Sequence, residues 1–482
     1  MQKKLKITNS QLLKIGQIAD REGFEIFAVG GFVRDLLMGK NSEDADIMVI
    51  GDALKFATIV AGEFDKKPDA MYKKFGTALV IADGMKLEFA SARKESYIKA
   101  SRKPEVVPAN LEEDLSRRDF TINSIAVSLN SDSFGLITDL FNGVEDISKK
   151  ILRTPLDPYK TFEDDPLRIM RALRFASRLE FTIDPLALEA MNKMAHRLSE
   201  DVVSQERITN EFMMILSSPK PSVGLSLMYL TGVMDHVFPE ISNLEGVDQR
   251  NEYHHKDVFR HTLTVVDNIS RNTENVWLRF AALVHDIAKP MTKRFVEGEG
   301  WTFHGHEEKG ARMMKPLFRK LKLPLNQLPY VEKLVRMHLR PIPLSKEEVT
   351  DSAIRRLAAD AGEDIEDLLM LCRADITSKN PEKVSKYMQN FEKVEKKILE
   401  VSEKDKLRNF HSPVRGEEIM EICGLTPGRT VGILKKRIEE AILDGIISNE
   451  YEEAKQYLYQ IKDEVLGARN GNETGKEKSP AL

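Results

Sequence analysis

The alternation of hydrophobic and polar residues predicts several short strands near the N-terminus. Two apolar runs, at 27–29 and 47–50, have the length of buried strands, and residues 78–82 and 86–90 add two more strand-like runs. Residues 9–22 instead have the spacing of an amphipathic helix. We expect the buried face of this helix to hold four apolar residues: Leu12, Leu13, Ile15 and Ile18.

Farther along the chain, helical patterns replace the strands. Residues 183–218 have helical spacing throughout, and residues 411–462 alternate helical segments with turns. At 482 residues the chain is too long for a single hydrophobic core. We therefore expect about two to four domains.

Composition narrows the class of protein without choosing a function. The chain is 41% hydrophobic and 31% charged, with a formal net charge of −4, which is typical of a soluble globular protein. This balance does not exclude nucleic-acid binding, because binding depends on where lysine and arginine cluster. Cys372 and Cys423 are the only cysteines, which fits a reducing cytoplasm. We expect neither a secretory signal nor a membrane-spanning segment.

A glycine pair and two aspartates form the first candidate site. Gly30 and Gly31 follow the first apolar run, and a backbone without Cβ atoms can approach a ligand closely. Asp44 and Asp46 begin the next run, and residues two apart on a strand face the same side, about 6.5 Å apart. With Arg34 nearby, two such carboxylates suit Mg²⁺ and the phosphates of a nucleoside triphosphate. A D-x-D motif alone is usually a solvated turn, so the prediction depends on its combination with the glycine pair and Arg34.

Two motifs together resemble a known family. The segments GGFVRD (30–35) and DAD (44–46) resemble the G-G-x-V-R-D and D-x-D pattern of the class II nucleotidyltransferases, which include CCA-adding enzymes and bacterial poly(A) polymerases. The segment RRDFTINS (117–124) resembles that family's RRDFTINA. In this block we expect Arg118 to bind phosphate through charge-assisted hydrogen bonds. We expect Asp119 to accept a hydrogen bond from a ribose 2′-OH, although a surface ion cluster would have the same residues.

Two further features lie in the same N-terminal part of the chain. Glu88 lies on a strand-like run and is a candidate third carboxylate near the D-x-D, with an exposed strand residue as the alternative. Residues 93–116 are polar and are predicted to form a long loop. The resemblance implies that this loop is flexible and assists the switch to the final A addition.

The segment EDDPLR (163–168) is predicted to begin a helix and resembles the family's E-D-x-x-R, with Asp164 in place of the usual Glu. Asp165 and Arg168 are three apart and would share a helical face. Cytosine and adenine both present an amino donor beside a ring-nitrogen acceptor, whereas guanine and uracil present the reverse. An ionised Asp accepts and an Arg donates, so this pair predicts selection of C and A without a nucleic-acid template.

Two more arginines continue the three-residue step. Arg171 should still reach the nucleotide, and Arg174 should brace the pocket or meet phosphate from the side, unless it belongs to a solvated basic face. Arg207 and Glu211, at i and i+4, are predicted to form a structural ion pair in a segment that resembles the family's S-x-E-R-I-x-x-E-L.

Histidines concentrate in the next part of the chain, where seven of the ten lie between residues 254 and 338. Their order with two aspartates resembles the H…HD…D signature of the HD superfamily of metal-dependent phosphohydrolases, including the two extra histidines of two-metal members. The resemblance implies six ligands: His261, His285, Asp286, His306, His338 and Asp375. These donors suit a divalent transition metal whose identity stays open. The metal would be either catalytic, as in relatives with phosphatase or 2′,3′-cyclic phosphodiesterase activity, or purely structural.

The tail contains LTPGRTVG (425–432), which resembles the family's P-G-x-x-V-G segment. Glycine lets backbone N–H groups face a phosphate, and a basic helix start follows, although such a helix is often only a solvated face. We expect tRNA contacts from four residues: Gly428, Lys435, Lys436 and Arg437.

The patterns and the resemblance together imply an α+β fold, with a small mixed-sheet nucleotidyltransferase head followed by an all-helical neck, body and tail. The expected bounds are 1–150 for the head, 151–220 for the neck, 221–400 for the body with its HD domain, 401–466 for the tail and 467–482 for a disordered C-terminus. The implied reaction is transfer of CMP and AMP from CTP and ATP to a tRNA 3′ end, with Mg²⁺ held by Asp44 and Asp46.

Other functions remain open at this point. A poly(A) polymerase or an A-only tRNA enzyme would have the same motifs. An HD phosphohydrolase with a nucleotide-sensing head is a different class, in which the histidines and not the D-x-D would be essential. A tRNA chaperone without catalysis is a third reading, which the complete D-x-D argues against. The sequence does not indicate an oligomeric state.

Overall fold

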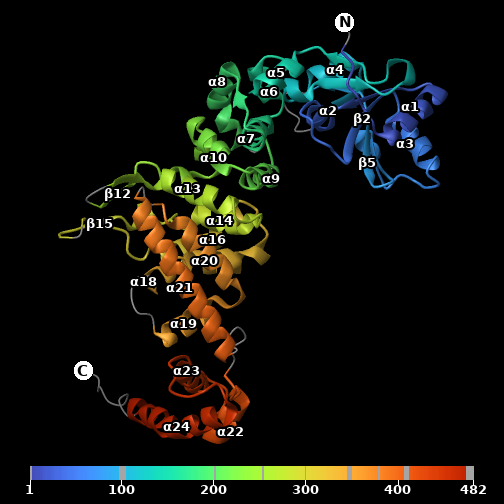
Figure 1. The fold of residues 1–482 in the computed structure, drawn as a ribbon. Coiled ribbons are helices and arrows are strands. Elements are labelled where there is room, and N and C mark those ends of the chain that lie inside the picture. The colour runs from blue at the N-terminus through green and yellow to red at the C-terminus, as the bar shows by residue number, and fades with distance from the viewer. Residues whose placement is uncertain are drawn as a thin grey trace, which may run out of the picture. The chain divides into compact units, whose positions relative to one another are not determined.

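A computed structural model of the chain describes residues 3–96, 105–199, 202–251, 254–298, 300–344, 350–377, 380–405 and 412–473. It has two compact units (Figure 1). The first comprises Met1–Asn243 with Leu321–Leu323, and the second comprises Leu244–Lys320 with Pro324–Leu482. Among the described helices, none is long and apolar enough to cross a bilayer.

A seven-stranded sheet with the order β3-β4-β5-β2-β1-β8-β9 organises the N-terminal part of the first unit. Its strands are β1 (Glu25–Val29), β2 (Asp44–Ile50), β3 (Ala70–Tyr72), β4 (Thr77–Ala82), β5 (Met85–Ser91), β8 (Ile125–Ser128) and β9 (Ile137–Asp139). Strands β2 and β5 are parallel, and the other neighbouring pairs are antiparallel. The expected mixed sheet is therefore confirmed.

Helices cover this sheet and share its hydrophobic core. They are α1 (Ser10–Glu22), α2 (Gly30–Leu37), α3 (Ala53–Gly62) and α5 (Gly143–Lys149). Leu12, Ile15 and Ile18 of α1 are buried as expected, but Leu13 is 42% exposed, so its assignment to the buried face was wrong. Each residue turns a helix by 100°, which directs Leu13 to the side opposite the other three.

Residues 93–116 are more ordered than the long loop that we expected. Strands β6 (Arg93–Ser96) and β7 (Glu105–Pro108) pair antiparallel, and α4 (Leu111–Ser116) follows them. Asn110 begins α4 with a capping box, in which its side chain accepts from the N–H of Glu113. Residues 97–104 lie outside the described residues, so the flexible loop stays a prediction there.

The neck helix starts later than predicted. Helix α6 (Pro158–Asp164) ends with the acidic residues that we placed in the first turn of the next helix, and α7 spans Leu167–Leu179. Asp165 lies between the two helices in extended conformation (φ −143°, ψ 99°) because the residue before a proline avoids helical geometry. Its side chain accepts the N–H of Leu167 at 3.1 Å.

The rest of the first unit is mainly helical. Its helices are α8 (Pro185–Met194), α9 (Gln205–Leu216), α10 (Pro221–Leu230), α11 (Val233–Val237) and α12 (Pro239–Ser242), with a two-stranded pairing of β10 (Ile151–Leu152) and β11 (Thr182–Ile183). Helices α7, α9 and α10 pack together, so the unit continues past the neck boundary that we set at 220.

The second unit is a helical body followed by three helices of the tail. The body helices are α13 (Val258–Ser270), α14 (Val276–Val284), α15 (Lys289–Thr292), α16 (His306–Lys320), α17 (Leu328–Met337), α18 (Pro341–Leu344), α19 (Asp351–Ala361), α20 (Ile365–Asp375) and α21 (Pro381–Asp405). Two hairpins interrupt the expected all-helical pattern: β12 (Asp248–Asn251) with β13 (His254–Asp257), and β14 (Arg294–Val296) with β15 (Gly300–Thr302).

The tail helices are α22 (Gly416–Cys423), α23 (Arg429–Leu443) and α24 (Tyr451–Glu473), and they share a small core of their own. Helix α24 continues through residues 467–473, which we expected to be disordered. Two good helix formers, Ala468 and Arg469, follow Gly467 directly, so this glycine does not end the helix. Residues 474–482 lie outside the described residues.

Candidate active site and metal centre

Three carboxylates gather on one face of the head sheet. Asp44 and Asp46 lie on the same side of β2, and Glu88 on the parallel strand β5 is in register with Asp46. Burial, and next the neighbouring carboxylate of Glu88, raise the pKa of Asp46. A cluster of acids that repel one another is stabilised by a divalent cation, so these residues fit the magnesium site that the sequence predicts.

The glycine pair leaves room for this cluster. Gly30 adopts a left-handed conformation (φ +70°), and a Cβ atom there would lie 2.9 Å from Oδ2 of Asp46 and 3.3 Å from Nη1 of Arg118. At Gly31 a Cβ atom would lie 3.4 Å from the guanidinium of Arg34. Gly30 is thus required both by its backbone conformation and by the side chains it faces.

The predicted phosphate-binding arginines are held by buried partners. Arg118 and Arg117 both pair with Asp114, which is almost completely buried and also accepts the N–H of Arg93. Burial acts to raise the pKa of Asp114, but the two guanidinium groups outweigh it and lower that pKa. Arg34 is fixed in a similar way, by Asp35 and by the amide oxygen of Asn123 at 2.9 Å.

Asp119 makes different contacts from those we expected. One carboxylate oxygen accepts from Nδ2 of Asn123 at 3.0 Å, and the other from Nη2 of Arg171 at 2.6 Å. Burial acts to raise its pKa, but Arg171 and Asn123 outweigh burial and lower it. Both oxygens are therefore already engaged by protein groups, and the hydrogen bond to a ribose 2′-OH stays a prediction.

The predicted base-reading pair lies beside these groups. Arg168 is 9% exposed and donates to the backbone oxygens of Arg117 at 2.6 Å and Thr161 at 3.3 Å. Asp165 precedes the helix, so the two residues are neighbours around its first turn and not along one helical face. Nη2 of Arg207 lies 3.4 Å from Oδ2 of Asp165.

Glu211 on α9 connects two arginines of α7. It pairs with Arg174 at 2.6 Å and approaches Arg171 at 3.8 Å. The predicted Arg207–Glu211 pair is therefore wrong, because Arg207 turns to Asp165 while Glu211 faces α7. The guanidinium of Arg174 also lies over the ring of Phe175, 4.2 Å from its centroid, which is compatible with bracing of the pocket, and that role stays a prediction.

Many of these groups line one cavity of about 480 Å³ within the first unit, although Asp44 and Glu88 are not among its lining residues. Nine arginines and three aspartates are among the residues that line it, so its walls favour a polyanion such as a triphosphate. The lining residues are Gly30, Gly31, Arg34, Asp46, Arg93, Arg117, Arg118, Asp119, Asn123, Asp165, Leu167, Arg168, Arg171, Arg174, Phe175, Arg178 and Arg207. The cavity thus brings Asp46 together with the Asp165–Arg168 pair, as the sequence predicted.

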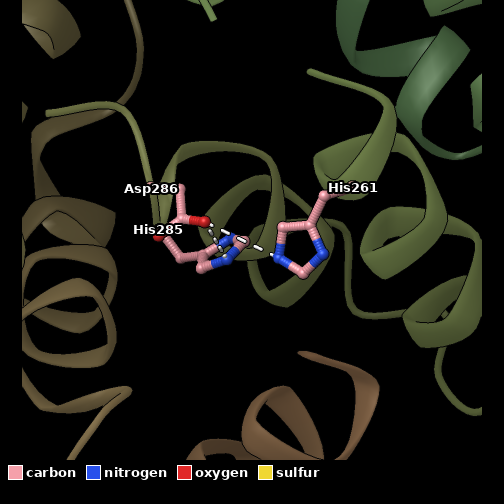
Figure 2. Close-up of side chains that lie close together, drawn as sticks. All are labelled: His261, His285 and Asp286. Carbon is pink, nitrogen blue, oxygen red and sulfur yellow. Dashed lines mark ion pairs between the residues drawn. The ribbon is translucent and has the colours of Figure 1, made fainter. Parts of the chain in front are cut away.

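In the second unit, the six predicted metal ligands meet at one buried place. His261 comes from α13, His285 and Asp286 follow α14, and these three form one candidate metal-binding group (Figure 2). His306 at the start of α16 and His338 after α17 form a second group with Asp286. Oδ2 of Asp286 lies 3.1 Å from Nε2 of His285, and Oδ1 lies 3.2 Å from Nε2 of His306. Asp286 can therefore bridge two ions.

The sixth residue, Asp375, lies against two histidines of the first group. Its Oδ1 lies 2.8 Å from Nε2 of His261 and 3.5 Å from Nε2 of His285. Burial acts to lower the pKa of His285, but the carboxylates of Asp286 and Asp375 outweigh it and raise that pKa to about 10. Two buried carboxylates at one place need positive charge nearby, which a divalent cation supplies.

The orientation of the imidazoles fits metal ligation. Nδ1 of His285, His306 and His338 each lies 2.7 Å from the carbonyl oxygen three residues earlier, which directs Nε2 inward. Nε2 of His306 and His338 are 3.3 Å apart, a distance at which two unprotonated nitrogens repel unless a cation lies near both. The buried Nε2 of His285 has no hydrogen-bond partner among the described residues.

The basic residues predicted to contact tRNA lie in the tail. Gly428 precedes α23, and Lys435, Lys436 and Arg437 lie on that helix. Each cation has a glutamate partner, the closest being Glu464 at 3.0 Å from Arg437. These pairs reduce the positive field of the helix, and the RNA contact stays a prediction.

Comparisons with known proteins agree with this arrangement. Three family models match: the poly A polymerase head domain over residues 26–153, the probable RNA and SrmB-binding site of polymerase A over 180–244, and the HD domain over 258–380. A multifunctional CCA protein of Shewanella frigidimarina is 34% identical over 311 residues, which cover 62% of this chain and 70% of that protein. The chain belongs to the tRNA nucleotidyltransferase family.

Other relatives of this nucleotidyltransferase match over a greater length. An A-adding tRNA nucleotidyltransferase of Deinococcus radiodurans is 29% identical over 453 residues, covering 91% of this chain and 96% of that protein. A crystal structure of the Bacillus stearothermophilus CCA-adding enzyme with CTP covers 96% of this chain and 98% of that chain, with a TM-score of 0.67 and 24% identity, which shows the shared fold. A tRNA nucleotidyltransferase complexed with a primer tRNA and an incoming ATP analog covers 80% of this chain and 99% of that chain, with a TM-score of 0.57 and 26% identity.

Several residues of the nucleotidyltransferase cavity were not predicted as site residues. Arg117 and Asn123 lie inside the recognised RRDFTINS block, so the motif itself could have indicated them. Asp114 lies just before that block, and its role depends on the one-turn spacing to Arg117 and Arg118. Arg207 lies in the segment that resembles S-x-E-R-I-x-x-E-L, but we assigned it to a structural pair with Glu211 and not to the cavity. Phe175 gave no comparable signal, because helix packing alone brings it to the cavity.

Proposed function

We propose that this nucleotidyltransferase adds CCA to the 3′ end of tRNA, using CTP and ATP. The observation that carries the proposal is the cavity that contains Asp46, the arginine walls and the Asp165–Arg168 pair within one unit. Names of relatives support the assignment, since the matched proteins include multifunctional CCA proteins, one of them 33% identical over 327 residues in Verminephrobacter eiseniae.

Within this proposal the protein binds and orients both substrates. Asp44, Asp46 and Glu88 would hold Mg²⁺, which when bound lowers the pKa of the attacking hydroxyl and stabilises the leaving pyrophosphate. Arg118 and its neighbours in the cavity bind the triphosphate, and Asp114 keeps Arg118 in place because it is buried and paired. Gly30 keeps the backbone clear of the carboxylate of Asp46.

Base selection in this proposal depends on Asp165 and Arg168. The bonds of Arg168 to two backbone oxygens fix its guanidinium while leaving other N–H groups to donate. Asp165 retains acceptor capacity beside its contacts to Leu167 and Arg207. Guanine or uracil would leave a buried donor or acceptor unpaired, which costs about 1–3 kcal/mol per group.

The test is nucleotide incorporation into a tRNA that ends at its discriminator base, with each of the four NTPs offered separately. We expect incorporation of CTP when it is offered alone, addition of A after C when CTP and ATP are then offered together, and at least about a hundredfold preference over GTP and UTP. Asp46→Ala should abolish both incorporations. Glu25→Ala, an exposed carboxylate at the opposite end of the neighbouring strand β1, is the matched control and should retain activity. Equal use of all four NTPs would contradict the role of Asp165 and Arg168.

A narrower activity, addition of A alone, is the second candidate. It is favoured by the match over nearly the whole chain to an A-adding tRNA nucleotidyltransferase. The same assay separates the two, because an A-adding enzyme would use ATP on a tRNA ending in CC but would not incorporate CTP at the discriminator base.

We also propose that the histidine–aspartate centre binds two divalent transition-metal ions and hydrolyses a phosphate ester. The inward Nε2 atoms and the bridging position of Asp286 support this proposal. Purified protein should contain about two such ions per chain, and the double variant His285→Ala, Asp286→Ala should lose both ions and any phosphatase activity. CTP incorporation by that variant should be retained. If the protein binds metal but hydrolyses no phosphate ester, the role of the centre is purely structural.

A further inference from the structure

The hairpin of β14 and β15, in the chain segment between Asp286 and His306, presents an aromatic surface. Phe295 and Trp301 are directly opposite each other across the hairpin, with ring centroids 5.5 Å apart and planes at 75°. Cross-strand aromatic pairs often stabilise hairpins. In this one, however, Phe295 remains 65% exposed, and Met291 just before the hairpin is 57% exposed. Stabilising the hairpin does not by itself account for that exposure.

Cations border this aromatic surface. Nζ of Lys293 lies over the ring of Trp301, 4.7 Å from its centroid, and Arg294 is exposed on the same strand as Phe295. Neither residue forms an ion pair with a carboxylate among the described residues. Nζ of Lys309, on α16, lies 3.4 Å from the backbone oxygen of Met291 and adds a third positive group. Aromatic rings bordered by free cations are typical of surfaces that bind single-stranded nucleic acid.

The hairpin is also linked directly to the centre. It lies in the segment between Asp286 and His306, both of which are metal-ligand candidates. Lys289 contacts Asp286 at 2.6 Å, and its ammonium group lies 5.7 Å from the ring centroid of Phe303, two residues after Trp301. Lys289 therefore connects the centre to Phe303, the residue that follows the second strand of the hairpin.

We propose that Phe295 and Trp301 form a stacking platform for a base of single-stranded RNA whose 3′ end lies at the histidine–aspartate centre. Phe295 supplies the open ring face, Trp301 supports it from the opposite strand, and Lys293, two residues before Phe295 and over the ring of Trp301, meets a flanking phosphate. The proposal rests on the function proposed above, in which RNA is the substrate class of the protein. It assigns a binding surface to a hairpin that the nucleotide-transfer site, in the first unit, does not use.

The test uses the full-length protein and the fluorescence of Trp301. The chain has two tryptophans, so the Trp277→Phe background leaves Trp301 as the only one. Trp277 packs against Phe280 and Phe318, where phenylalanine keeps an aromatic ring. A six-nucleotide single-stranded RNA ending in CCA is titrated in, and three other probes are compared with it. These are an abasic ribose-phosphate chain of the same length, AMP alone and CMP alone.

We expect the RNA to quench the fluorescence of Trp301. The abasic chain has the same charge but no bases, so we expect it not to quench this fluorescence. The mononucleotides should bind at least about tenfold more weakly than the RNA, since they meet fewer cations. Phe295→Ala and Phe295→Leu should each weaken RNA binding by about tenfold, because leucine keeps apolar bulk but loses the flat face. Leu325→Ala, an exposed apolar residue elsewhere in the same unit, should leave binding unchanged.

Three results would overturn the proposal: no quenching by RNA, equal quenching by the abasic chain, or unchanged binding in both Phe295 variants. Equal binding by mononucleotides and RNA would assign the surface to free nucleotides instead, and would overturn the RNA part. If the Trp277→Phe background does not fold, anisotropy of the fluorescein-labelled RNA compares wild type with the Phe295 and Leu325 variants. None of these readouts requires nucleotide transfer, so their failure is distinguishable from failure of CTP incorporation.

Discussion

Replacing Gly30 with alanine tests the geometry of the transfer site most directly. The substitution has two separate effects. A residue with a Cβ atom at φ +70° costs about 1–2 kcal/mol in folding free energy. The new Cβ would also lie 2.9 Å from Oδ2 of Asp46, so the carboxylate must retreat by about 0.5 Å to reach an ordinary contact distance. Displacements of this size at reacting groups reduce rates by about tenfold or more.

Gly39 provides the matched control for this substitution. Its φ is +72°, nearly identical to that of Gly30, but a Cβ atom there would meet nothing within 4 Å. Gly39→Ala should therefore lose the same 1–2 kcal/mol or so of stability in a denaturant titration. It should retain the wild-type kcat for CTP incorporation, whereas Gly30→Ala should lose at least about tenfold in kcat. The reasoning is refuted if the two variants have the same kcat, or if Gly30→Ala changes only the KM for tRNA.

Three further predictions concern groups that the tertiary structure brings together. Glu211→Gln should lower the free energy of unfolding by about 3–5 kcal/mol in a denaturant titration, because it leaves the buried guanidinium of Arg174 without its carboxylate partner. A decrease below about 1 kcal/mol would contradict the importance of this pair. His306→Gln should lower the bound metal from about two ions to one per chain, because His306 belongs to only one of the two groups. Plasma mass spectrometry measures the metal content, and loss of both ions or of neither would contradict two separable sites. The pKa of Asp119 is lowered in the folded state by its pair with Arg171. This pair therefore stabilises the folded protein fully at pH values above the unfolded pKa of about 3.9, and the stabilisation is lost as the pH falls through the lower folded pKa. Asp119→Asn should remove this part of the acid dependence in a pH series of denaturant titrations, and an unchanged pH dependence would show that the pair contributes little.

Much of the transfer site was predictable because its chemistry follows from local geometry. The two-residue period of a strand puts Asp44 and Asp46 on one face wherever that strand lies. The glycine pair predicted a close approach of backbone to ligand, and the structure places Gly30 against Asp46. Two of the failed predictions overlooked a local rule: Pro166 keeps Asp165 out of the helix, and the capping box at Asn110 starts a helix inside the supposed loop.

The sequence by itself determined which chemical groups this protein has and, over a few residues, which of them face the same way. Only the tertiary structure decided which distant groups become partners. Arg171 meets Asp119 across 52 positions, and Arg207 meets Asp165 across 42 instead of the nearby Glu211. Helical periodicity could indicate only Glu211 as a partner for Arg207, and the packing of α7 against α9 brought Asp165 beside it instead. The physical reason is that backbone periodicity fixes the directions of side chains only within one helix or strand. The free energy of burying a charged group depends instead on the partners that tertiary packing places beside it.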